Sequence, residues 1–165
     1  MTLGLDRDQT EVTAHMASYL DLLSLVERLH RLMLDVIKDE FERLGLLEIN
    51  SVQALLLFNV GEQEVTAGEL RSRGYYQGSN VSYNLKKLVE LGYMHHQRSQ
   101  VDRRSVRVRL TDKGRRVRAL LEQLFARHAQ TLAARATLPP TQMDTANGTL
   151  RQMERFWSDQ IRYIY

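Results

Sequence analysis

The sequence predicts a mainly α-helical fold with one small β-hairpin, and three observations support this class. Apolar residues recur every three or four positions in a long stretch at each end of the chain, which is the spacing of amphipathic helices. Between them lie two shorter helical stretches joined by a turn that contains glycines. A five-residue run then alternates apolar and basic residues, the period of a half-buried strand. With 165 residues, 43% of them hydrophobic, the chain is expected to form a single domain, residues 1–165.

Residues 14–47 predict the first long helix, which Gly45 ends. The stretch contains no proline and no interior glycine. Its apolar surface is wider than one core contact needs, because Leu20, Leu23 and Leu34 fall outside the main stripe. Surplus apolar surface on a long helix is usually buried against a partner. The stretch is therefore expected to be a dimerisation helix.

The middle of the chain predicts a helix-turn-helix. Residues 51–60 form one short apolar helix. Thr66 and Glu69 have the spacing of a capping box, in which each side chain satisfies a backbone amide at the start of the next helix. A turn with glycines then leads to a further helix over residues 79–91. Two short helices joined by such a turn are typical of this motif.

A β-hairpin is predicted directly after the helix-turn-helix, from residues 93–98 and 106–110. In the second strand Arg107 and Arg109 alternate with valine and leucine, so one face is expected to be buried and the other basic. A hairpin in this position is a wing. Residues 48–110 are therefore expected to form a winged helix-turn-helix lobe.

Residues 111–165 predict two long helices separated by a pair of prolines. Thr111 is the expected N-cap of the first, and Thr141 with Asp144 has the capping spacing for the second. Apolar residues continue almost to the last position, which a frayed end in water would not tolerate. We expect these helices to join residues 14–47 in a dimer interface, the alternative being docking within the same chain.

The net charge of +3 conceals a strong asymmetry. Residues 71–118 carry thirteen Lys and Arg against three Asp and Glu, a local net charge of +10, which leaves −7 for the rest of the chain. Such a block is typical of a surface that meets a polyphosphate. The alternative is a solvated basic face without a partner.

The second helix of the helix-turn-helix has two chemically different sides. At 100° per residue, Val81, Leu85 and Leu88 fall in one sector that must face the core, with Asn84 near its boundary. The other sides carry hydroxyls, a carboxamide and cations, the groups that contact base edges and phosphates. An ordinary solvated face is the alternative. The residues of this helix expected to bind DNA are Ser79, Asn80, Ser82, Tyr83, Lys86 and Lys87.

The wing supplies further cations. An arginine at a hairpin tip can enter a narrow minor groove, where the negative potential is enhanced. Asp102 is expected to pair with a neighbouring arginine and hold the tip in shape. For Arg107 and Arg109 the alternative is that they keep an exposed strand soluble. The wing residues expected to bind DNA are Arg98, Arg103, Arg104 and Arg107.

Four motifs occur along the chain: Thr66-x-x-Glu69-Leu70, Ser79-Asn80-Val81-Ser82, Leu88-x-x-x-Gly92-Tyr93, and Asp102-Arg103-Arg104 followed by Leu110-Thr111-x-x-Gly114. Together they resemble MarR-type winged-helix transcription regulators over nearly the whole chain, and the last motif, in the wing, is the most specific. The resemblance implies a homodimer, with the helix at residues 79–91 in the major groove and Arg104 at the minor groove. The stretch 74–83 further resembles the alphaproteobacterial branch.

One position departs from the pattern of the family. Many members carry an arginine where this chain has Tyr83. A tyrosine can bond a phosphate or pack on a thymine methyl group, but it cannot form the bidentate fork of an arginine on guanine.

The resemblance also implies a pocket for a small aromatic effector, since many relatives respond to such molecules. His30, Phe41 and Phe58 are the candidate lining residues, and the alternative is that they belong to the core. A thiol-based signal is excluded because the chain has no cysteine.

No catalytic constellation is found, and no enzyme activity, metal or cofactor is expected. His95 and His96 are adjacent on a strand and point to opposite faces, so they cannot readily share a metal ion. There is no signal peptide and no apolar run long enough to span a bilayer, so a cytoplasmic protein is expected. The predicted function is that of a sequence-specific regulator binding double-stranded DNA as a homodimer on a pseudo-palindromic operator. The alternatives are a winged-helix protein-interaction module and a non-specific architectural DNA binder.

Overall fold

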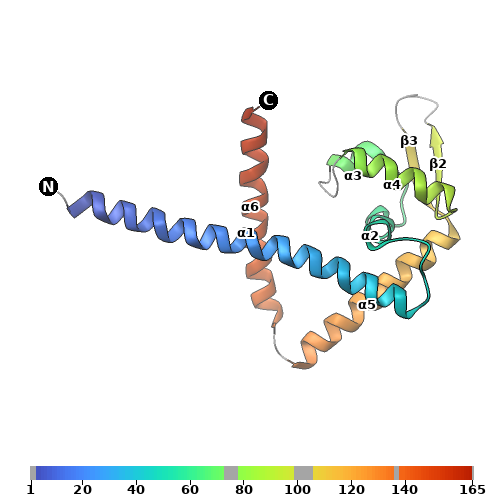
Figure 1. Ribbon diagram of the computed structural model, residues 1–165, viewed down its shortest axis with the longest axis horizontal. Coiled ribbons are helices and arrows are strands. Elements are labelled where there is room, and N and C mark those ends of the chain that lie inside the picture. Colours follow the sequence, from blue (N-terminus) through green and yellow to red (C-terminus); the bar gives the residue numbers. More distant parts are fainter. Residues whose placement is uncertain (1–2, 73–77, 99–105, 136–137, 165) are drawn as a thin grey trace. The chain divides into compact units, whose positions relative to one another are not determined.

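The computed structural model describes residues 3–72, 78–98, 106–135 and 138–164 (Figure 1). The elements in order are α1 (Leu3–Arg43), α2 (Ser51–Val60), β1 (Val65–Thr66), α3 (Ala67–Ser72), α4 (Gly78–Glu90), β2 (Met94–Arg98), β3 (Val106–Leu110), α5 (Asp112–Arg135) and α6 (Pro140–Ile164). The chain divides into two compact units, Met1–Leu121 and Glu122–Tyr165, with the division inside α5. That all 165 residues act as one domain stays a prediction.

The first helix is longer than predicted and ends where glycine allows it to. α1 begins at Leu3 rather than near residue 14. At its other end Gly45 has a φ of +69°, a conformation that favours glycine. The Gly45 amide donates to the Glu42 carbonyl at 3.1 Å and the Leu46 amide donates to the Phe41 carbonyl at 2.8 Å. This pair of bonds is a Schellman motif, so Gly45 ends the helix as predicted.

The first unit has one apolar core, to which its helices and its sheet all contribute. α1 supplies two of the buried residues, and α2 supplies more than any other element. The sheet contributes the inward-facing side chains of β2 and β3. The buried apolar residues are Ile37, Phe41, Ile49, Ala54, Leu56, Leu57, Val60, Val65, Leu70, Val81, Leu85, Leu88, Tyr93, Met94, Val108, Leu110, Val117 and Leu121.

The wing is part of a three-stranded antiparallel sheet in the order β1-β3-β2. In β3, Val108 and Leu110 are buried while Arg107 and Arg109 are exposed, so the predicted alternation is confirmed. β1 was not predicted, because two residues are too few to show a period. The mainly helical fold with a hairpin wing is thus confirmed, and Figure 1 shows α3, α4 and the hairpin close together.

The predicted helix caps are confirmed at two starts and wrong at a third. The Glu69 amide donates to Thr66 Oγ1 at 3.0 Å and the Thr66 amide donates to Glu69 Oε2 at 2.6 Å, which completes the capping box of α3. Thr111 caps α5 by accepting from the Gly114 amide at 3.1 Å. Thr141 caps nothing, since α6 already begins at Pro140. The fixed φ of proline suits the first helical position, which explains the earlier start.

Two helices keep apolar stripes on their exposed surfaces. On α1, Leu25, Leu29, Leu32 and Val36 follow a spacing of three and four and remain 40% to 62% exposed. α6 has a similar stripe, formed by Met143, Leu150, Trp157 and Ile161. Within the described ranges, no helix combines the length and apolar character needed to cross a membrane.

Candidate nucleic-acid interface

Helix α4 is held against the core by one side and by its C-terminal end. Val81 and Leu88 are fully buried and Leu85 nearly so. After the helix, Gly92 has a φ of +78°, its amide donates to the Val89 carbonyl, and the Tyr93 amide donates to the Leu88 carbonyl. This second Schellman motif turns the chain directly into β2.

The opposite side of α4 is exposed and polar, as predicted. Asn80, Ser82, Tyr83, Lys86 and Lys87 are all exposed, Tyr83 to 67%. Because side chains at these spacings share one side of a helix, they present a carboxamide, hydroxyls and ammonium groups to the same space. Ser79 lies in the first turn of α4, but its side chain is outside the described part of the structure.

Asn84 does not belong to this exposed group, because its amide is already bonded. Gln53 of α2 donates from Nε2 to Asn84 Oδ1 at 3.2 Å, and Asn84 Nδ2 donates to the Asn80 carbonyl at 2.9 Å. Gln53 is itself buried and completes a capping box with Asn50 at the start of α2. The chain of bonds ties α4 to α2 at the turn that carries Asn80. The sequence gives no indication of it, since Gln53 and Asn84 are 31 residues apart.

The wing residues are described only in part. The backbone of Arg98 pairs with Val106 at the far end of the hairpin, and its side chain is outside the described residues. Arg107 is exposed on β3, with its guanidinium 3.7 Å from the carboxylate of Glu64. Asp102, Arg103 and Arg104 lie wholly outside the described residues, so the tip contacts stay predictions.

The base of the wing is fixed to the start of α5 through Thr111. Its hydroxyl donates to the Gly92 carbonyl at 2.7 Å and its amide donates to the Tyr93 carbonyl at 3.0 Å. A Cβ at Gly114 would overlap that Tyr93 carbonyl oxygen. Glycine is therefore required here by a close approach of two backbone segments.

A charged cluster joins the same region to the segment before α2. Glu48 accepts hydrogen bonds from Lys113 Nζ at 2.7 Å and from the Tyr93 hydroxyl at 2.6 Å. Lys113 also donates to the Leu91 carbonyl at 2.9 Å and lies 4.2 Å from the centroid of the Tyr93 ring. The hydrogen bonds from Lys113 and then Tyr93 hold the pKa of the Glu48 carboxyl below its ordinary value. Sequence reasoning missed this cluster, because 65 residues separate Glu48 from Lys113.

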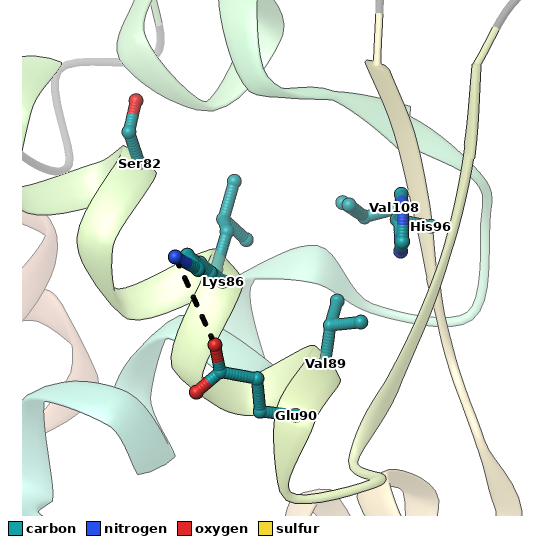
Figure 2. A pocket seen from close by; sticks show the side chains of 7 residues that line it. Ser82, Lys86, Val89, Glu90, His96 and Val108 are labelled. Carbon is teal, nitrogen blue, oxygen red and sulfur yellow. Dashed lines mark ion pairs between the residues drawn. The ribbon is translucent and has the colours of Figure 1, made fainter.

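An open groove of about 420 Å³ separates α4 from the wing (Figure 2). Leu85 and Val89 of α4 and Val108 of β3 give it an apolar floor. Ser82 and His96 also line it, and Figure 2 shows the Lys86–Glu90 ion pair at its edge, 4.0 Å long. The groove adjoins the polar face of α4, to which Ser82 and Lys86 belong.

The three residues predicted to line an effector pocket lie in different environments. Phe41 is buried and lines a cavity of about 200 Å³ between the end of α1 and the start of α2. Neither His30 nor Phe58 lines that cavity. His30 is exposed on α1, and Phe58 is half-buried on α2. Their role in binding an effector stays a prediction.

No group of three or more His, Cys, Asp or Glu with the geometry of a metal site occurs among the described residues. His95 pairs in register with Arg109 on one face of the hairpin, whereas His96 pairs with Val108 and lines the groove. The two side chains leave β2 on opposite faces, as the alternation of a strand requires, although both also line a polar depression with Glu64 and Arg107.

Comparisons with known proteins find a winged-helix domain in the same part of the chain. Residues 49–114 match a family model described as a winged helix DNA-binding domain. The exopolysaccharide II synthesis transcriptional activator ExpG of Rhizobium meliloti (strain 1021) is 35% identical over 162 residues, which are 97% of this chain and 83% of that protein.

Solved structures share the fold at lower identity. Streptococcus pneumoniae FabT in complex with DNA has a TM-score of 0.67 at 18% identity, covering 86% of this chain and 99% of that one. Staphylococcus aureus MarR in complex with salicylate and kanamycin has a TM-score of 0.68 at 21% identity, covering 87% of this chain and 94% of that one.

Proposed function

This chain belongs to the MarR-type winged-helix transcription regulators, and from that membership we propose that it binds double-stranded DNA as a homodimer and reads a pseudo-palindromic operator. α4 would lie in the major groove and the wing would reach the adjacent minor groove. The regulatory role follows from the family, and the operator, the dimer and an effector are the parts that require a test.

The exposed side of α4 carries the proposal. Five polar side chains face outward from a helix whose other side is buried, and the hydrogen bonds through Asn84 and the turn at Gly92 fix the helix to its support. Side chains held in one geometry can discriminate base edges, whereas a mobile helix would lose part of that discrimination to ordering entropy. Lys86 and Lys87 add charge for the phosphates on either side of the groove.

The homodimer is supported by the apolar stripes of α1 and α6. Leu25, Leu29, Leu32 and Val36 form a continuous exposed row on α1, and α6 has a comparable row. Burying such rows in a second copy of the same chain would remove them from water, at about 25 cal/mol for each Å² of apolar surface. In a two-fold dimer, the two α4 helices would contact two half-sites whose centres lie about one helical turn of DNA, 34–36 Å, apart.

The test is selection of duplexes from a random pool by the purified protein at near-physiological salt. Enrichment of an inverted repeat with half-sites about one turn apart would support a dimeric operator-reading regulator. Tight binding without an enriched sequence would identify an architectural DNA binder instead. No binding to any duplex would favour a winged-helix module that binds an acidic protein.

A small aromatic molecule bound in the groove of Figure 2 is the second part of the proposal. The groove is large and apolar enough for one aromatic ring, and salicylate is present in the similar structure of Staphylococcus aureus MarR. Salicylate should weaken binding of the selected operator by the wild-type protein.

Substitution of the two wing histidines gives a matched test of this site. His96→Trp should fill the groove and remove the response to salicylate, whereas His95→Trp, on the other face of β2, should retain it. An equal response in both variants would place the effector elsewhere, with the Phe41 cavity as the next site to examine.

A further inference from the structure

The hairpin has a second polar surface, directed away from α4, which we call the outer wing face. It consists of His95 and Gln97 of β2 and Arg107 and Arg109 of β3, all exposed. The register pairs His95 with Arg109 and Gln97 with Arg107, so the four side chains form two adjacent cross-strand pairs. Together with Glu64 and the neighbouring His96 they surround a shallow polar depression of about 190 Å³.

The charge of this face is largely uncompensated. Glu64 is the one carboxylate among the residues that line the depression, and it lies 3.7 Å from Arg107 with both side chains well exposed. An exposed pair of this kind is worth little, so Arg107 can exchange its partner at low cost. Arg109 has no ion-pair or hydrogen-bond partner in the described part of the chain. The face therefore offers two guanidinium groups, a carboxamide and an imidazole to an anion.

The chemistry of the face favours phosphates over a protein partner. The anchors of protein interfaces are tryptophan, tyrosine or arginine side chains in desolvated pockets, whereas both arginines of the outer wing face are exposed and no large apolar side chain accompanies them on that face. Contacts to a phosphate backbone need only donors and positive charge, and arginine is well suited to them. The apolar residues of the same strands, Val108 and Leu110, are buried on the other side of the sheet.

Position on the hairpin indicates which DNA the face would meet. Val108, on the reverse face, lines the groove against α4, and its partner His96 lines both that groove and the depression. Neighbouring residues in a strand point to opposite sides, so the outer wing face points away from α4. It would therefore also point away from the major groove of DNA in which α4 would lie. We propose that the outer wing face binds backbone phosphates of the DNA that flanks the operator, outside the base pairs contacted by α4 and the wing tip. This inference rests on the proposed function.

The proposal is tested with two duplexes that share the selected operator. One ends at the operator, and the other continues for about ten base pairs of arbitrary sequence on each side. The wild-type protein should bind the longer duplex several-fold more tightly and with a steeper dependence on salt. Arg109→Gln should lose most of that advantage. For the long duplex, the slope of the logarithm of the binding constant against the logarithm of the salt concentration should become shallower by about one unit per protomer. Its binding to the short duplex should stay unchanged.

Two further variants separate the contact from general charge. Arg109→Lys keeps the positive charge and should retain most of the advantage of the long duplex. Arg151→Gln removes the same charge from the exposed surface of α6 and should leave the advantage intact. A thermal unfolding midpoint for each variant identifies any that fail to fold.

The outcomes are distinct. Equal losses by Arg109→Gln on both duplexes would place Arg109 at the operator itself and overturn the proposal. No loss on either duplex would also overturn it and make an acidic protein the partner to seek. Failure of the wild-type protein to bind the short duplex would instead contradict the proposed function, on which this inference depends.

Discussion

Lys87 differs from the neighbouring lysine of α4 in having no ion-pair partner among the described residues. Lys86 lies 4.0 Å from Glu90, whereas Lys87 is exposed and makes no ion pair within the described ranges. Lys87→Ala should therefore weaken binding to all duplexes alike and reduce the log–log salt slope by about one unit for each Lys87–phosphate contact. Lys38→Ala, the same change on exposed α1, is the matched control. An unaltered slope would mean that Lys87 does not touch phosphate.

Gly114 and Gly148 form a natural pair for testing the backbone contact at the wing base. A Cβ at Gly114 would overlap the Tyr93 carbonyl oxygen, while one at Gly148 in α6 meets nothing within 4 Å. Gly114→Ala should cost roughly 1–3 kcal/mol of unfolding free energy, because backbone must move. Gly148→Ala should stabilise the protein by about 0.5–1 kcal/mol through helix propensity. Urea unfolding measures both, and a neutral Gly114→Ala would contradict the close approach.

At the level of single residues, the sequence predicted environments better than partners. The burial of Val81, Leu85 and Leu88 and the exposure of the α4 cations follow from helical periodicity, which is a local property. The Gln53–Asn84 bond depends on how two distant helices meet, and no periodicity encodes that. The helical angle alone places Asn84 near the boundary of the core sector and does not identify its partner.

At the scale of the elements, Glu48, Tyr93 and Lys113 join the segment before α2 to the start of β2 and to α5. Their hydrogen bonds should make the free energy of unfolding depend on pH. Hydrogen bonds from Lys113 and then Tyr93 lower the folded-state pKa of Glu48. A carboxyl whose pKa is lowered by folding stabilises the protein above its unfolded-state pKa, and the contribution is lost as pH falls through the folded-state value. The stability advantage of wild type over Glu48→Gln should thus be complete above about pH 5 and shrink towards zero in more acid solution.

Tyr93→Phe provides the control for this prediction. It keeps the carboxylate and the buried ring but removes one of the two donors to Glu48. As pH falls, the free energy of unfolding of Tyr93→Phe relative to that of Glu48→Gln should decrease. The decrease should be smaller than the one expected for wild type. Chemical unfolding between pH 3 and 7 makes the comparison, and identical pH profiles for wild type and Glu48→Gln would show that the cluster is not formed.

Element boundaries show where local signals suffice. The structure confirms the predicted helix end at Gly45 and the predicted starts at Thr66 and Thr111, because each is formed by hydrogen bonds between residues close in the sequence. β1 was missed because its two residues are a strand only through pairing with β3. The start of α6 was misplaced because proline at the first position outweighed the threonine and aspartate pattern.

On the scale of the whole molecule, the exposed row of α1 predicts how the proposed homodimer can be disrupted. Leu29 is 62% exposed at the middle of this row. Leu29→Glu should raise the dimer dissociation constant roughly a hundredfold or more, because an interface residue of this kind is worth about 2 kcal/mol and the two-fold axis introduces the change twice. Lys38→Glu, exposed and away from the row, should leave the constant unchanged. Sedimentation equilibrium measures both, and an undisturbed Leu29→Glu dimer would place the interface elsewhere.

The apolar row of α6 has a practical consequence, since Trp157 is part of it and is the one tryptophan of the sequence. An indole that is partly in water emits at longer wavelength than one enclosed by apolar groups. If α6 packs against a second copy, dilution through the dissociation range should shift the intrinsic emission to the red without any added label. The protein would then report its own assembly state optically, at concentrations too low for most hydrodynamic methods.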